Sequence, residues 1–268
     1  MTAAPKLRIL RVLRVLVARE ISLVLHYRWW LAMMQLSNII APAISLLVWR
    51  GAIAQGATPP VSESFLTTYL VLVSLVSMLT SSWTSGFLAA GIRLGELNSW
   101  LVRPCSTHVN GLANNVAEKL MKLTLLAPLA VALGLLFRDK VALPPPGLRW
   151  IAFLVALFMA AGMTFALDVV IGSLAFWFED VSAIDRLRQL LARTLSGALI
   201  PLALFPAAFS GFLTAQPFRF MVSFPLEVLL GRPSDESYLL AVGWFTTFLG
   251  AAVVIWRIGL RNYQGAGA

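Results

Sequence analysis

The residue types that carry out catalysis are scarce in this chain and never occur at catalytic spacing. There are only two histidines, His26 and His108, and no His-Glu-x-x-His or Gly-x-Ser-x-Gly pattern. A phosphate-binding loop needs a lysine directly after a glycine, and each of the four lysines follows another residue. The single cysteine, Cys105, excludes an internal disulfide and a multi-cysteine metal site. We therefore predict that the chain is not an enzyme and has no catalytic residue, cofactor or metal of its own.

One acidic residue, Asp168, lies deep inside an apolar stretch, between Arg149 and Glu179. An ionisable group at that depth costs about 3 kcal/mol or more unless it is paired or hydrated. Asp168 is therefore a candidate for lining a translocation pathway. The alternative is a structural hydrogen bond to a neighbouring helix, for which the candidate partners are Ser77, Thr80, Ser81 and Thr84.

Another apolar stretch carries more hydroxyl groups than a helix facing lipid needs. They belong to Ser74, Ser77, Thr80, Ser81, Ser82, Thr84 and Ser85. Small hydroxyl residues let helices approach closely and bond across. The pattern indicates either tight packing at a dimer seam or the lining of a cavity, and we place Thr80 and Thr84 with Asp168 as candidate pathway residues.

The elements that position these residues must be membrane helices, because 59% of the chain is hydrophobic and only 12% is charged. A soluble globule has roughly 45–50% apolar and about 25% charged residues. The net charge of +9 comes from basic residues that lie between apolar runs, where they orient helices. Nucleic-acid binding is therefore not expected.

Uncharged stretches long enough to cross a bilayer predict an all-α integral membrane protein, a single permease domain over 1–268 with six transmembrane helices. The expected spans are 29–55, 64–92, 112–138, 149–178, 188–207 and 238–257. Pro217 and Pro225 interrupt the apolar segment 209–231, which we interpret as short re-entrant helices in the outer leaflet. The alternative is a full span there, which would give seven.

Loop charges favour six spans with both termini in the cytoplasm, since Lys and Arg gather on the cytoplasmic side. Of the 21 basic residues only Arg50, Arg138, Lys140, Arg149, Arg219 and Arg232 then lie outside, which leaves 15 inside. This count treats Arg186, Arg188 and Arg193 as inner-loop charges.

The first 28 residues read as a basic amphipathic helix on the inner leaflet, because four arginines share one arc and the apolar side chains the opposite one. The alternative is an extension whose charges only enforce orientation. No compact apolar core with a cleavage site indicates a signal peptide.

The connector 93–104 is predicted to form a short helix that Pro104 ends. Leu97, Trp100 and Leu101 sit at helical spacing and would make one apolar face, flanked by Glu96 and Arg103. Such a face can lie on the bilayer or fit a groove on another protein, and composition does not choose between them.

At this connector the sequence resembles a known family. Gly95-Glu96-Leu97 followed by Leu101-Val102-Arg103-Pro104 is similar to the Gly-Glu-Leu…Leu-Leu-Arg-Pro segment of the ABC-2 family of ABC-transporter permeases. Three further segments resemble the pattern of that family in order and spacing: 174–177, 197–206 and 224–231. Val102 and Cys105 stand where leucine is more usual.

The resemblance implies a permease subunit that pairs with a second permease, identical or homologous, and with two cytosolic P-loop ATPases that hold ATP and Mg. The connector would be the coupling helix, with Arg93, Glu96, Leu97, Trp100, Leu101 and Arg103 as ATPase-coupling residues. Segment 1–28 resembles the interfacial elbow of the family. Segment 209–231 resembles its outer-leaflet helices, with Phe224, Pro225 and Glu227 as the candidate outer gate.

The expected function is export of an amphiphilic lipid-like, peptide or drug-like substrate across a bacterial plasma (inner) membrane, in contact with membrane lipid. One alternative is an ion-coupled secondary transporter, which needs a relay of intramembrane ionisable groups, whereas Asp168 is almost alone. The other is a non-transporting membrane scaffold, which would lack an ATPase partner.

Overall fold

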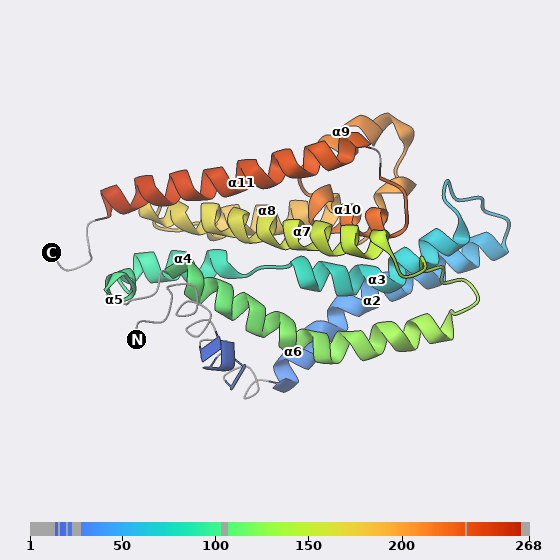
Figure 1. Ribbon diagram of the computed structural model, residues 1–268, viewed down its shortest axis with the longest axis horizontal. Helices are drawn as coiled ribbons and strands as arrows, with labels where there is room; N and C mark the ends of the chain where they lie inside the picture. The colour runs from blue at the N-terminus through green and yellow to red at the C-terminus, as the bar shows by residue number, and fades with distance from the viewer. Residues whose placement is uncertain are drawn as a thin grey trace.

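The computed structural model describes residues 14–15, 17–19, 21–22, 28–102, 107–233 and 235–263, and within these every regular element is helical. The long helices are α2 (Arg28–Ala54), α3 (Glu63–Thr80), α4 (Thr84–Arg93), α6 (Thr107–Leu136), α7 (Leu148–Ser173), α8 (Ser182–Leu195) and α11 (Asp235–Asn262). Most of the long helices run roughly along one axis, while α2 and α6 lie oblique to it (Figure 1). Shorter elements are α5 (Leu97–Leu101), α9 (Ser210–Ala215), α10 (Arg219–Leu229) and 3-10 turns at Leu174–Phe176, Leu202–Leu204 and Ala207–Phe209.

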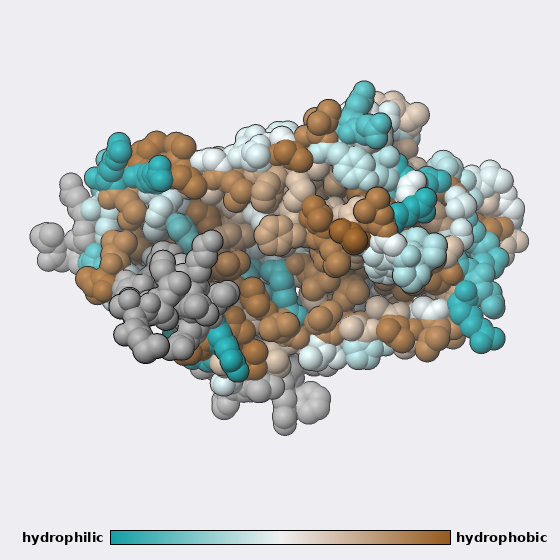
Figure 2. Space-filling view, in the orientation of Figure 1, coloured by the Kyte–Doolittle hydropathy of each residue, from teal (hydrophilic) through white to brown (hydrophobic). Residues whose placement is uncertain are grey.

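Four segments of the described residues are long and apolar enough to cross a membrane: Glu63–Arg93, Thr107–Leu136, Leu148–Phe176 and Asp235–Asn262. At about 1.5 Å per residue each exceeds a hydrocarbon core of roughly 30 Å. The 27-residue α2 has a similar length, and α8 runs along the same axis. Apolar side chains cover much of the middle of the visible face, and hydrophilic ones gather mostly toward its ends (Figure 2). The fold is thus the predicted all-α membrane type, while a total of six spans stays a prediction.

The second predicted span, 64–92, coincides with the candidate span Glu63–Arg93, but it is not one continuous helix. Residues 81–83 leave the helical path between α3 and α4, and Ser81 is extended at φ −62° and ψ 154°. Neither proline nor glycine lies there. The break is stabilised by charged partners from α6 and α7, which are described with the site below.

The fifth predicted span, 188–207, does not form one helix over these residues. Helix α8 begins earlier, after Asp180 accepts hydrogen bonds from the Ser182 backbone N–H (2.8 Å) and hydroxyl (2.9 Å). These bonds hold the pKa of the Asp180 carboxyl below its usual value. The helix ends at Leu195, because Gly197 adopts a positive φ of +84° and prolines 201 and 206 cannot continue a helix. The chain goes on through turns rather than as a single helix.

The re-entrant segment 209–231 contains α9 and α10, joined by a turn. The 11-residue α10 is too short to cross the bilayer alone, and it packs on α7 and α3 with nearly all its side chains buried. Phe220 and Leu226 of α10 meet Leu66, Tyr69 and Val73 of α3 in the main core. The predicted N-terminal helix 1–28 lies largely outside the described residues.

Gly197→Ala should lower the stability of the fold by about 2 kcal/mol. A Cβ at this positive φ costs about 1 kcal/mol, and it would stand 2.5 Å from the Tyr69 hydroxyl oxygen. That hydroxyl has one hydrogen to donate, to Gly197 O (3.0 Å) or to Ser223 Oγ (3.2 Å), and the hydrogen bond is worth about 1 kcal/mol. Thermal unfolding in detergent, followed by tryptophan fluorescence, measures the change. Gly211→Ala is the control, since nothing lies within 4 Å of its added Cβ. Equal unfolding temperatures for the two variants would contradict the predicted destabilisation by a Cβ at position 197.

Candidate functional site

The break between α3 and α4 leaves two helix ends facing each other inside the bundle, and a charged side chain satisfies each. At the N-terminus of α4, the backbone N–H groups of Thr84 (2.8 Å) and Ser85 (3.4 Å) donate to Asp168 Oδ2 of α7. Beyond the C-terminus of α3, Lys119 Nζ of α6 donates to Ser81 O (2.7 Å). A carboxylate at a helix N-terminus and a cation at a C-terminus both complement the helix dipole. Specific side-chain contacts from α6 and α7 therefore stabilise the break.

Asp168 also joins the break to α8. Its Oδ1 lies 3.3 Å from an Arg188 guanidinium nitrogen, an ion pair without hydrogen-bond alignment. Arg188 makes two hydrogen bonds to Asp185 Oδ1 (2.9 and 3.0 Å), and Asp185 also accepts from the hydroxyl of Ser85 (3.0 Å). This network holds α4, α7 and α8 together at one level of the bundle.

A second network ties the break to α6. Asn115 Nδ2 donates to Thr84 Oγ1 (2.7 Å), and Asn115 Oδ1 accepts from Lys119 Nζ (3.3 Å). Three helices thus fix the position of the first turn of α4. Any movement of α4 along its axis must break or carry along contacts to α6, α7 and α8.

These contacts decide where the candidate pathway residues lie. Asp168 is fully buried and Thr84 is buried, and neither lines the cavity beside the break. Their assignment to a pathway stays a prediction. The structural alternative for Asp168 fits better, although its partners are backbone N–H groups of Thr84 and Ser85 and the guanidinium of Arg188. Thr80 does line the cavity, with its hydroxyl donating to Val76 O (3.0 Å).

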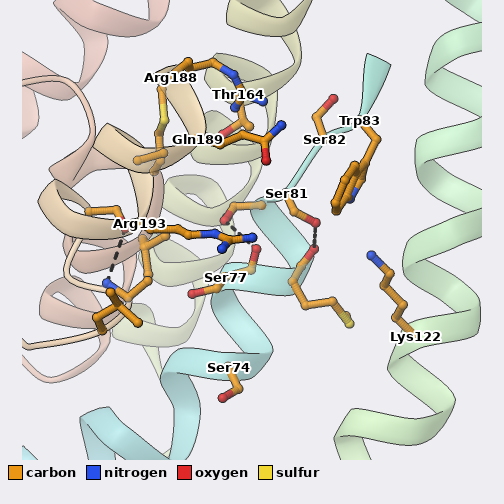
Figure 3. A pocket seen from close by; sticks show the side chains of 18 of the residues that line it. Ser74, Ser77, Ser81, Ser82, Trp83, Lys122, Thr164, Arg188, Gln189 and Arg193 are labelled. Carbon is orange, nitrogen blue, oxygen red and sulfur yellow. Dashed lines mark hydrogen bonds between the residues drawn. The ribbon is translucent and has the colours of Figure 1, made fainter. Parts of the chain in front are cut away.

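The cavity has a volume of about 430 Å³ and lies among α3, α6, α7, α8 and α10 beside the break. Figure 3 shows its polar side chains converging from several helices. The hydroxyl groups on its wall belong to Ser74, Ser77, Thr80, Ser81, Ser82, Thr164 and Ser196. The two alternatives predicted for the hydroxyl cluster therefore apply to different residues. Most of the cluster lines the cavity, while Thr84 and Ser85 hold the break.

Sequence reasoning missed Arg193 as a site residue, because it was counted among the inner-loop charges. It lies two residues before the end of α8, about 16 Å along the helix from Ser182. Its side chain extends toward Ser77 and Ser81 in the cavity (Figure 3). The predicted span 188–207 already contains Arg193, so applying that span to the charge count would have removed it from the loop.

The connector forms the short helix α5, as predicted, but the side chains that it exposes differ from those expected. Leu97 is fully buried and the Trp100 ring lies against Gly91, so these two side chains fix α5 to α4. This corrects the expected apolar face of Leu97, Trp100 and Leu101. Leu101 is exposed, and the other exposed residues of the connector include Arg93, Leu94, Glu96 and Val102. Arg103 lies outside the described residues.

The three candidate outer-gate residues lie in α10 and are packed inside the molecule. Phe224 and Pro225 are buried in the core. Glu227 Oε2 accepts from Arg219 (2.5 Å), and its Oε1 accepts from the Ser223 hydroxyl (2.6 Å). Since Ser223 bonds Tyr69 of α3, this cluster anchors α10 to the bundle.

Comparison with known proteins gives one family assignment. Residues 62–267, which include the break, the cavity, the connector and α10, match the family model described as ABC-2 family transporter protein. No curated protein matches the chain.

Proposed function

The chain belongs to the ABC-2 family of transporter proteins and is an integral membrane permease of an ABC transporter, and we propose that separate cytosolic P-loop ATPases drive it. Two such ATPases would bind ATP and Mg, and a second permease, identical or homologous, would complete the translocation pathway. We propose that the complex exports an amphiphile across a bacterial plasma membrane. Both termini of the chain would lie in the cytoplasm.

One observation carries the coupling part of this proposal: α4 leads from the exposed connector directly to the helix break. The ten residues of α4 make a rod about 15 Å long. One end is fixed to α5 by Leu97 and Trp100, and the other end is held by Asp168. An ATPase that moved the connector would therefore push or pull on the break and, through Arg188, on α8. Contiguous contacts of this kind are what mechanical coupling requires.

The docking surface we propose consists of the exposed residues Arg93, Leu94, Glu96, Leu101 and Val102. Leu94 is 63%, Leu101 50% and Val102 84% exposed, so three apolar side chains stand free beside an acid and a base. An apolar centre with a charged rim is the usual composition of a protein interface. Within the described residues, Leu97 and Trp100 support this surface from behind.

The same contacts favour this function over an ion-coupled carrier. A proton or sodium relay needs ionisable groups that exchange their partners along a path. Asp168 is instead held by two backbone N–H groups and Arg188, and Lys119 by Ser81 O and Asn115.

Leu101→Glu should reduce the recovery of a P-loop ATPase with the permease by at least about ten-fold, because interface centres lose one to several kcal/mol when their apolar contacts are removed. The tagged chain is purified from native membranes in mild detergent, the captured proteins are identified by mass spectrometry, and ATP hydrolysis is assayed. Leu101 is half-exposed, so the variant should fold normally.

Leu148→Glu is the matched control, since Leu148 is 80% exposed at the opposite end of the bundle. It should retain the ATPase. Capture of no ATPase by the wild-type chain would refute the proposed function in favour of a scaffold or an ion-coupled carrier, and equal capture by both variants would refute the docking surface.

A further inference from the structure

The wall of the cavity beside the break carries positive charge without negative charge. Its charged lining residues are Lys122, Arg188 and Arg193, and no Asp or Glu lines it among the residues that the structure describes. In Figure 3 Arg193 reaches in from α8, while Lys122 approaches from α6 on the other side of Ser81. A ligand in the cavity would therefore meet positively charged side chains.

Two of these cations are already neutralised by the protein. Lys122 pairs with Glu118 one turn before it on α6. Arg188 pairs with Asp185 (2.9 Å) and Asp168 (3.3 Å). Arg193 makes no ion pair with any carboxylate in the described part of the chain, so it is the cation that remains available.

Arg193 is an exposed residue at the wall of the cavity, and its position along the bundle makes an unpaired charge costly. Ser77, toward which it extends, lies near the middle of the candidate span Glu63–Arg93. An arginine at such a depth costs about 3 kcal/mol or more and marks a ligand or ion pathway unless a partner neutralises it. The apolar bilayer outside the cavity cannot supply that partner.

A second copy of this chain offers no obvious carboxylate either. Of the 12 acidic residues in the sequence, the described ones within the bundle, Glu118, Asp168, Asp185 and Glu227, are all engaged in ion pairs. The other described ones lie at helix ends or in connecting segments: Glu63, Glu96, Asp139, Glu179, Asp180, Asp235 and Glu236. The counter-ion of Arg193 is therefore expected from outside the protein.

The groups around Arg193 suit an oxyanion. A guanidinium presents a planar fork of N–H donors that matches phosphate and carboxylate groups. The Ser77 hydroxyl oxygen is buried on the same wall and has no hydrogen-bond partner among the described residues. It is free to donate to an anion held by Arg193.

The cavity also has the size and the apolar side that an amphiphile needs. Its volume of about 430 Å³ falls within the usual range of roughly 300–1,000 Å³ for small-ligand sites. Met78, Leu199, Met221 and Val222 also line it. An acyl chain or another apolar body can lie against these residues while the headgroup reaches Arg193.

We propose that this cavity binds the anionic headgroup of an amphiphile, a phosphate or carboxylate on an apolar body, with Arg193 as its counter-ion and Ser77 as a hydrogen-bond donor. This inference rests on the proposed transport function and gives it a substrate class. It replaces the broader expectation of a lipid-like, peptide or drug-like substrate.

Binding to the purified full chain tests the inference without any ATPase. Native mass spectrometry and tryptophan-fluorescence titration compare phosphatidylglycerol with phosphatidylcholine, which differ in headgroup charge. The wild-type chain should prefer phosphatidylglycerol by about ten-fold, the effect of one charge-assisted contact of about 1.4 kcal/mol. Arg193→Gln should abolish the preference, and Arg193→Lys should retain part of it.

Arg186→Gln is the matched control, because Arg186 is exposed on the same helix, as Arg193 is, but does not line the cavity. It should keep the full preference, and unfolding temperatures show that each variant is folded. Inorganic phosphate at millimolar concentration should not displace the lipid. Displacement by phosphate would identify a site for soluble anions and refute the proposal that the ligand is an amphiphile. An equal preference for phosphatidylglycerol in Arg193→Gln and the wild type would refute the role of Arg193 as the counter-ion.

These results are separable from the test of the proposed function. Loss of the preference with ATPase capture intact would overturn only the headgroup site. Retained preference without any captured ATPase would refute the coupling to ATPases and leave an anionic-amphiphile site in a different kind of membrane protein.

Discussion

Asp168→Ala should lower the free energy of unfolding by about 3–5 kcal/mol, one of the two largest effects that we expect of a single substitution. The change removes the acceptor for the Thr84 and Ser85 N–H groups, and each unsatisfied buried donor costs about 1–3 kcal/mol. It also takes one of two carboxylates from the buried Arg188. Unfolding in detergent, followed by tryptophan fluorescence, measures the loss.

Two further variants separate a structural role of Asp168 from a direct role in transport. Asp139→Ala removes a carboxylate whose side chain is 89% exposed, and it should leave stability unchanged within about 0.5 kcal/mol. Asp168→Asn keeps an oxygen for the backbone donors and should lose less stability than Asp168→Ala. Its transport per folded molecule should stay near the wild-type value, and a complete loss of transport in a stably folded Asp168→Asn would contradict the structural role.

Glu227→Ala should destabilise the protein by a similar 3–5 kcal/mol, because it leaves the buried guanidinium of Arg219 without its carboxylate. The Ser223 hydroxyl loses its acceptor as well. Since this cluster anchors α10, the loss should also expose the core beneath it to proteolysis. Equilibrium unfolding and limited proteolysis measure both effects.

Replacing both partners by apolar residues provides the internal check. Arg219→Met with Glu227→Met should recover at least half of the lost stability, because a buried ion pair is often matched by apolar packing. Glu63→Ala is the matched surface control: its partner Lys140 is half-exposed, so the cost should be at most about 1 kcal/mol. A Glu227→Ala variant no less stable than Glu63→Ala would contradict the assigned role of the pair.

The parts of the fold that depend on composition could be predicted from the sequence. Long apolar segments predict membrane helices whatever their partners, so the all-α fold and the helical course of most spans follow from hydropathy. The family resemblance found at the connector is confirmed by the match over residues 62–267.

The break in the second span could not be predicted, since its cause lies in other helices. Residues 81–83 contain neither proline nor glycine, and the extended backbone is stabilised by Lys119 and Asp168, which are distant in sequence. The only local signal is the run of hydroxyl residues from Thr80 to Ser85, whose side chains compete for backbone hydrogen bonds.

The site residues were misplaced for a related reason: burial depends on what packs against a helix. Helical spacing groups Leu97 with Trp100 and Leu101, but it does not say that α4 covers the first two. The charge count placed Arg193 on the inner side although the predicted span 188–207 contains it, and the structure places it two residues before the end of α8.

Site-directed cross-linking at the connector tests most directly that an ATPase drives this permease through α5. In a Cys105→Ser background, a cysteine replaces Val102, which is 84% exposed, or Leu148, which is 80% exposed at the opposite end of the bundle. Native membranes are treated with a short thiol-to-amine cross-linker, and the products are identified by mass spectrometry. We predict that Val102→Cys links to a P-loop ATPase and that Leu148→Cys does not. A Val102→Cys chain that links to lipid-embedded proteins alone, or to no protein, would contradict the account.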